Sequence, residues 1–294
     1  MLKLHIFIVV CSFPIRLNAQ TNYQGYIDKL PIELVIDISA DGGVTAVYTY
    51  QKFNEPIVIK GIQHGDTLAL LERDKQGNVS STLTFFSFKR KKSLLTGTWK
   101  NLQSNEELPI KLSKEFEIEE GNNIEWKGRE LIQLASLNKY YFKLVTSKLK
   151  GDYYARITGV KVLQKKTGSL VQMLTTDCQL GGLDDIEIDD YNFDGSKDFS
   201  IFESSYAGPN TSRVYFLFKP ETRKFFDSKY KGISLEFDQK KKRIYEHNQC
   251  CAGLQHMTAT YKLVKNKMVL IDQHCLIWNE KRQDFIERKM KACQ

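Results

Sequence analysis

Near its middle the sequence reads Ile188-Asp189-Asp190-Tyr191-Asn192-Phe193-Asp194-Gly195-Ser196-Lys197-Asp198-Phe199. Asp190, Asn192 and Asp194 are two residues apart, so one tight loop can turn all three side-chain oxygens inward around the glycine. The backbone carbonyl of Ser196 and the carboxylate of Asp198 can complete a shell of oxygen ligands, which suits a hard cation. The stretch therefore predicts a structural Ca²⁺ site made by these five residues.

The residues on both sides of this loop indicate strands. Ile186 and Ile188 precede it, and Phe199 and Ile201 follow it, with the two-residue period of a half-buried strand. No glutamate stands twelve positions into the loop and no helical period flanks it, so a helix-loop-helix calcium site is not expected. Because the oxygens would all hold the cation, we expect no catalytic residues here.

The first half of the chain predicts an antiparallel meander over residues 20–115. Short alternating segments recur about every ten residues and are separated by turn sequences rich in Gly, Asn and Asp. Ile32, Leu34, Ile36 and Ile38, for example, would share one buried face. About seven strands of this kind are enough for a sandwich or a partly closed barrel.

A second β domain is predicted over 129–294, after an acidic, weakly patterned linker at 116–128. The expected class is therefore all-β with two domains, and the second domain would be β-propeller-like or a sandwich. The segment from Glu130 to Leu137 is the one place where the pattern also allows a short helix.

The N-terminal residues predict export. Residues 1–19 combine an early lysine, an apolar run and a small-residue end, as in a secretory signal, so the mature chain would be periplasmic or secreted. Lipid attachment at Cys11 is not expected, because bulky Val9 and Val10 precede it. No later stretch approaches the roughly 20 apolar residues of a membrane-spanning helix.

The positive charge does not predict a nucleic-acid partner. The net charge is +8, and the basic clusters lie at Lys89–Lys92 and Lys240–Arg243 without interleaved aromatic residues. Lysine-rich turn tips are common in β proteins, so we interpret both clusters as solvated turns. Attraction to an anionic surface is the alternative.

Five cysteines follow the predicted signal, which in an oxidising compartment predicts two disulfides and one free thiol. Their pairing is left open among Cys178, Cys250, Cys251, Cys275 and Cys293. The two adjacent cysteines are expected to bond to separate partners, because neighbouring residues close a strained ring. A zinc site that also uses the nearby histidines is a weaker alternative, since no paired two-residue spacing supports it.

The second half, roughly 155–290, resembles the exported domains that carry the calcium loop of FG-GAP or VCBS repeats. It is most similar to the periplasmic group that inhibits lysozyme-type, peptidoglycan-degrading effectors, including immunity proteins. The matching features are the turn and strand at 167–172, the calcium loop, the Gly- and Asn-containing segment 204–210, the aromatic strand 214–218 and the turn at 222–225. This resemblance implies Ca²⁺ as a structural cofactor and a peptidoglycan hydrolase as protein partner.

The segment after the calcium loop is the candidate binding loop. Small residues around one aromatic side chain on a rigid hairpin could insert Tyr206 into an enzyme cleft at a low entropic cost. The candidate partner-binding residues are Ser204, Ser205, Tyr206, Gly208 and Asn210. An ordinary hairpin loop is the structural alternative.

Function is expected to be binding, with no catalysis. The chain lacks a Gly-x-Ser-x-Gly elbow and a His-Glu-x-x-His motif. Its first half resembles β-meander domains common in exported proteins of Bacteroidetes-type bacteria, which implies no particular activity. We therefore expect a hydrolase inhibitor, or alternatively an envelope module that recognises a glycan or another surface protein.

Overall fold

The computed structural model describes residues 19–293, and over this range the chain is built from strands. Its 21 strands are accompanied by two short 3₁₀ turns, η1 (Cys251–Gly253) and η2 (Met290–Ala292), with no α-helix in the described range. The predicted all-β class is confirmed. Accordingly, residues 19–293 include no helix that could span a membrane. The predicted signal, apart from Ala19, and Cys11 lie outside the described residues.

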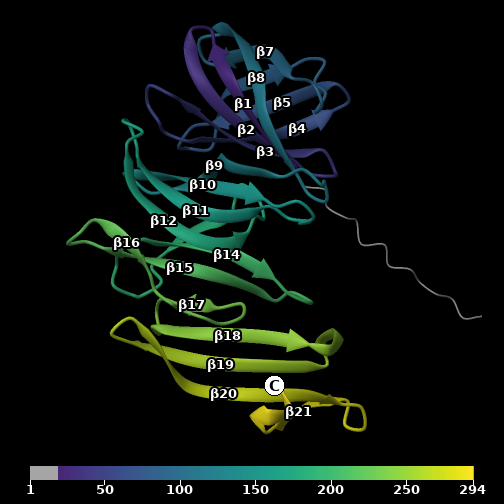
Figure 1. The fold of residues 1–294 in the computed structure, drawn as a ribbon, viewed down its shortest axis with the longest axis vertical. Helices are drawn as coiled ribbons and strands as arrows, with labels where there is room; N and C mark the ends of the chain where they lie inside the picture. The colour runs from purple at the N-terminus through teal and green to yellow at the C-terminus, as the bar shows by residue number, and fades with distance from the viewer. Residues whose placement is uncertain (1–18, 294) are drawn as a thin grey trace, which may run out of the picture.

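The first eight strands form a closed barrel in sequence order, in which the first strand also pairs with the eighth (Figure 1). They are β1 (Ala19–Ile27), β2 (Leu30–Ile38), β3 (Gly43–Tyr50), β4 (Ile57–His64), β5 (Thr67–Arg73), β6 (Val79–Phe85), β7 (Leu94–Asn101) and β8 (Glu107–Glu119). Ile32, Leu34 and Ile36 are buried in the barrel core, as the alternating pattern predicts. Closure leaves this sheet without an open edge.

Three antiparallel sheets follow the barrel, each a meander of consecutive strands. The first holds β9 (Trp126–Ser136), β10 (Tyr140–Lys148), β11 (Arg156–Gln164) and β12 (Leu170–Gln179). The second holds β13 (Ile186–Asp189), β14 (Asp198–Ser205), β15 (Thr211–Lys219) and β16 (Lys224–Asp227). The third holds β17 (Glu236–Asp238), β18 (Arg243–Cys250), β19 (Gln255–Val264), β20 (Lys267–Asn279) and β21 (Asp284–Arg288). Figure 1 shows the sheets following one another from the barrel to the C-terminal end.

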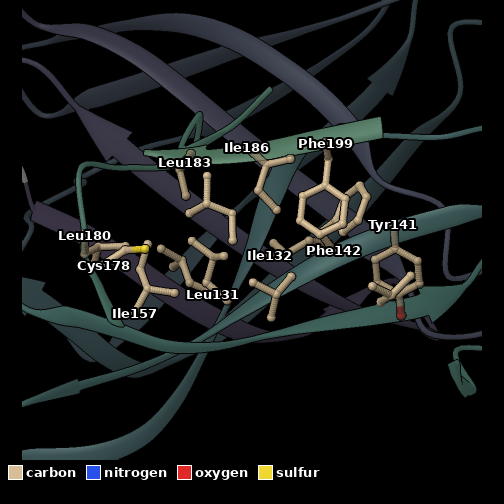
Figure 2. Packing of buried hydrophobic residues seen from close by; sticks show 14 of the residues in the cluster. Leu131, Ile132, Tyr141, Phe142, Ile157, Cys178, Leu180, Leu183, Ile186 and Phe199 are labelled. Atoms are coloured by element: carbon tan, nitrogen blue, oxygen red, sulfur yellow. The ribbon is translucent and has the colours of Figure 1, made fainter. Parts of the chain in front are cut away.

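The barrel shares a hydrophobic core with the sheets that follow it. Val35 and Val47 lie on the barrel strands β2 and β3, yet they belong to the same buried cluster as Leu131, Phe142 and Phe199. Figure 2 shows the last three of these residues within the cluster. These two valines of the barrel are therefore covered by protein and not by water.

The predicted linker at 116–128 is mostly strand. β8 continues to Glu119 and β9 begins at Trp126, so only 120–125 connects them. Ile118 is buried, and Phe116 and Trp126 pack against the core that both parts share. The acidic composition made the segment resemble a linker, although its charged side chains alternate with buried ones as they do on a strand. The segment that allowed a helix, Glu130 to Leu137, is also extended and lies largely in β9.

One disulfide is present among the described cysteines, where two were predicted. Cys275 and Cys293 are bonded, with their Cα atoms 5.8 Å apart. Cys178 is free and buried, and Cys250 and Cys251 are free and exposed. The prediction that the adjacent cysteines reach separate partners is therefore wrong: neither is bonded, and they lie at the end of β18 and the start of η1. The zinc alternative loses Cys275, which is bonded to Cys293.

Candidate calcium loop and binding hairpin

The predicted calcium loop joins β13 to β14, two strands of one hairpin, as the flanking apolar residues predicted. Ile188 pairs with Phe199 and Asp189 with Asp198, so the loop leaves and re-enters a regular antiparallel ladder. A hairpin holds the two ends of the loop at a fixed separation, which limits the conformations that the loop can adopt.

Within the loop, the acidic side chains accept hydrogen bonds from the loop's own backbone. Asp190 accepts the N–H of Asp194 at 3.0 Å and the N–H of Gly195 at 2.7 Å. Asp194 in turn accepts the N–H of Ser196 at 2.7 Å. Gly195 has a φ of 88°, a conformation that glycine adopts without strain. These bonds wind the chain tightly around the first carboxylate of the loop.

Asp198 lies beneath the loop and is fully buried. One carboxylate oxygen accepts the N–H of Tyr191 at 2.9 Å, and the other accepts the N–H of Phe218 at 2.8 Å. The side chain thus connects the loop to the neighbouring strand β15. Asp190 and Asn192 are half-buried and Asp194 is exposed, so the proposed ligands line the loop from its floor to its surface.

The charges of the loop repel one another. Burial, together with the carboxylates of Asp194 and Asp190, raises the pKa of Asp198 to about 7. Burial also acts on Asp194, but hydrogen bonds from Ser196 and Asn192 leave the pKa of that carboxyl below its usual value. A cation between these groups would offset the repulsion.

The side chains and the carbonyl of the loop are of the donor types that Ca²⁺ takes. Three carboxylates, one amide oxygen and the carbonyl of Ser196 are all hard oxygen donors, which is the ligand chemistry that calcium takes. No group of three or more His, Cys, Asp or Glu side chains is arranged to hold a metal ion within 19–293. The case for calcium therefore depends on the mixed set of carboxylate, amide and carbonyl oxygens and on the mutual repulsion of the acids.

The third sheet supports the loop from outside, through contacts that sequence reasoning missed. Gln239 donates its side-chain amide to the carbonyl of Asp190 at 2.8 Å, and Lys242 donates to the carbonyl of Phe193 at 3.3 Å. Both donors lie in the turn between β17 and β18. The sequence indicates only a solvated turn for the basic cluster there. Its contact with the loop leaves no local pattern in the sequence, because 49 residues separate the partners.

The candidate binding hairpin follows directly, where β14 turns into β15. Tyr206 is 51% exposed, and its N–H donates to the carbonyl of Asn210 at 2.9 Å across the turn. Ser205 and Gly208 are exposed and Ser204 is half-buried. The structure thus brings the small residues and the aromatic side chain together at one hairpin tip.

Asn210 differs from the prediction that it contacts a partner. Its side chain is buried, and its amide nitrogen donates to the carbonyls of Ala207 and Gln249 at 3.1 and 2.7 Å. Its carbonyl oxygen accepts the N–H of Gln249 at 3.1 Å. Asn210 therefore fastens the hairpin tip to β18 and has no free donor to offer. From the sequence alone, an asparagine that bonds to the backbone of a neighbouring strand cannot be distinguished from a surface asparagine in a Gly- and Pro-containing turn.

We expect Asn210→Ala to loosen the hairpin tip locally. The substitution leaves the backbone N–H and carbonyl of half-buried Gln249 without their side-chain partner. Leaving a buried polar group unsatisfied costs up to about 1–3 kcal/mol. Hydrogen exchange should show faster exchange of the Tyr206 amide, while barrel amides such as that of Leu34 keep their wild-type rates. Unchanged exchange at Tyr206 would mean that the hairpin is held by other contacts.

A groove of about 580 Å³ borders the calcium loop. Ser196 and Lys197 of the loop form one wall, and the rings of Tyr140, Phe218 and Phe225 contribute apolar surface. The cationic side chains lining it are Lys139, Lys197 and Arg223. Such a groove suits an anionic ligand with an apolar part.

Comparisons with known proteins add little to this geometry. No known protein-family profile matches the chain, and no curated protein matches it. Among solved structures it is similar to a Xanthomonas protein described as type IV secretion system related, with 14% sequence identity and a TM-score of 0.29. The match covers 92% of this chain and 99% of that one. We take neither fold nor function from a likeness of this size.

Proposed function

We propose that the chain is an exported, calcium-stabilised binding protein that inhibits a peptidoglycan-degrading enzyme of the lysozyme type. Asp190, Asn192, Asp194, Asp198 and the carbonyl of Ser196 would hold Ca²⁺, whose role is to neutralise the loop and fix its shape. The hairpin tip at 204–210 would contact the enzyme.

One observation carries the proposal: an exposed aromatic side chain stands on a hairpin that is fixed on both sides. Asp198 ties the start of β14 to β15, and Asn210 ties the tip to β18. Tyr206 is held between these points with half of its surface exposed. A binding loop that is ordered before association loses little conformational entropy on binding, which favours tight inhibition.

Tyr206→Ala tests the contact. Purified protein is titrated against a lysozyme-type muramidase while the clearing of a peptidoglycan suspension is followed. The wild type should slow the clearing, and Tyr206→Ala should weaken inhibition by at least about tenfold, as expected for a buried aromatic anchor. Tyr26→Ala, which removes a barrel tyrosine that is 53% exposed, is the matched control and should inhibit as the wild type does.

Failure of the wild type to bind or slow any lysozyme-type enzyme would contradict this proposal. Equal inhibition by the wild type and Tyr206→Ala would instead place the contact elsewhere on the surface.

The groove beside the calcium loop favours a second candidate function, recognition of an anionic envelope glycan or surface protein. Its aromatic rings can contact the apolar part of such a ligand, and its cations can contact the charged part. Arg223→Ala should weaken such binding and Tyr206→Ala should not. The two variants therefore separate the two functions.

A further inference from the structure

The two adjacent cysteines lie closer together than their position predicts. β18 ends at Cys250 and η1 begins at Cys251, and both side chains are exposed. Neighbours on a regular strand point to opposite faces, which would keep their sulfur atoms apart. Here the two Sγ atoms are 2.7 Å apart.

An unusual backbone brings the two thiols together. Cys251, Ala252 and Gly253 have φ values of 57°, 54° and 82°, so three consecutive residues are left-handed. Only the glycine adopts this conformation freely, and the side chains of the other two make it unfavourable. The left-handed turn folds Cys251 back onto the side of the chain where Cys250 lies.

Contacts outside the pair hold this turn in place. Leu254 donates its N–H to the carbonyl of Cys251 at 3.1 Å and accepts the N–H of Trp278 at 2.8 Å, while Gln249 is bound on the other side to Asn210. Hydrogen bonds on both sides thus fix the backbone of the two cysteines, while their thiols face solvent.

The other described cysteines are not available to either thiol. Cys178 is buried in the core between the first two sheets, and Cys275 is bonded to Cys293. The nearest reaction partner of each exposed thiol is therefore its neighbour.

We propose that Cys250 and Cys251 form an oxidisable vicinal dithiol, a modification site that a low-molecular-weight disulfide converts to an intramolecular disulfide. One thiolate attacks a sulfur of the oxidant, expels one thiol and forms a mixed disulfide. The second thiolate then attacks the protein sulfur of that bond and expels the other thiol. The protein loses two electrons and two protons, and one oxidant disulfide becomes two thiols.

The closed form should reopen readily. Adjacent Cα atoms are about 3.8 Å apart, below the usual disulfide range of about 4.4–6.8 Å, so the ring is strained and more reducible. The site is expected to respond reversibly to the thiol–disulfide balance of its surroundings, and it does not depend on the proposed calcium or inhibitor function.

A single peptide reports the reaction. Trypsin cleaves after Arg243 and Lys262, and the peptide between them contains Cys250 and Cys251 but no other cysteine. The full-length protein, in its thiol form, is treated with glutathione disulfide, alkylated and digested with trypsin. The mass of the peptide is then measured by mass spectrometry. We expect this peptide to lose two hydrogen atoms and to gain no alkyl group and no glutathione.

Cys250→Ser and Cys251→Ser are the matched controls. Each should stop at the mixed disulfide, with one glutathione retained on the peptide. A wild-type peptide that keeps one or two glutathiones, or that is cross-linked to Cys11, Cys178 or a second chain, would overturn the proposal.

A trivalent arsenical gives a second measurement that does not require oxidation. Phenylarsine oxide bridges two thiols that are close together, so the reduced wild-type protein should retain one arsenical on the same peptide. Both single-serine variants should lose at least about ten times more of it on washing, since one thiolate ligand replaces two. Equal retention by the wild type and a single variant would show that the thiols do not act as a pair.

Discussion

Millimolar calcium should raise the midpoint of thermal unfolding of the protein, and Asp194→Ala should abolish the rise. A cation that binds only the native loop stabilises it by about 2.7 kcal/mol when calcium is at a hundredfold excess over its dissociation constant. For a chain of this size that corresponds to a rise of roughly 5 °C. The physical source is the relief of repulsion among Asp190, Asp194 and Asp198. Calorimetry with calcium and with a chelator measures it.

Asp66→Ala is the control for the loss of a carboxylate. Asp66 is an exposed acid in a barrel turn, so its variant should keep the full response to calcium. If calcium has no effect on the wild type, the loop is a hydrogen-bonded turn without metal. If the midpoint of Asp194→Ala rises as much as that of the wild type, calcium acts at another place.

A second large effect is expected from pH, through Asp185. This side chain is 4% exposed at the start of the second sheet, where Gly181 donates its N–H to the carboxylate at 2.9 Å. Burial raises the pKa of Asp185 from 3.8 to about 7, despite that hydrogen bond. Because the pKa is raised in the folded state, the stabilising contribution is complete below about pH 4 and is lost as the pH rises through about 7.

The loss amounts to about 4 kcal/mol, since each pKa unit is about 1.4 kcal/mol. Urea unfolding of the wild type and Asp185→Asn between pH 4 and 8 measures it. Relative to the variant, the wild type should lose stability steadily across this range, because the amide carries no charge at any of these pH values. Parallel curves for the two proteins, or a carboxyl titration of Asp185 near pH 4 by NMR, would contradict the prediction.

The periodic parts of the fold could be predicted from the sequence. Ile32, Leu34 and Ile36 face the barrel interior because alternation specifies the face of a strand once one side is buried. The strands on either side of the calcium loop were predicted for the same reason. The number of strands and the closure of the barrel could not be predicted, because closure depends on the pairing of β1 with β8 over the whole length of the barrel.

Contacts between segments that are distant in the sequence could not be predicted from it. Both ends of the predicted linker are strand because Ile118 and Trp126 pack on the core that the barrel shares with the following sheets. The two adjacent cysteines were expected to bond to separate partners because a disulfide between neighbours is strained. The three consecutive left-handed residues that bring their sulfur atoms together could not be predicted from the sequence. Asn210 was assigned to a partner because its own partner, Gln249, lies 39 residues away.

The burial of Val35 and Val47 has a consequence for the order in which the chain is made. A growing chain completes all eight barrel strands before the sheet that covers these valines exists. Until then two apolar side chains on the finished barrel face water or a chaperone. If synthesis stops after β8, these two valines stay exposed on the barrel. Chaperones and proteases that bind exposed apolar surface should therefore recognise such truncated products more readily than full-length chains.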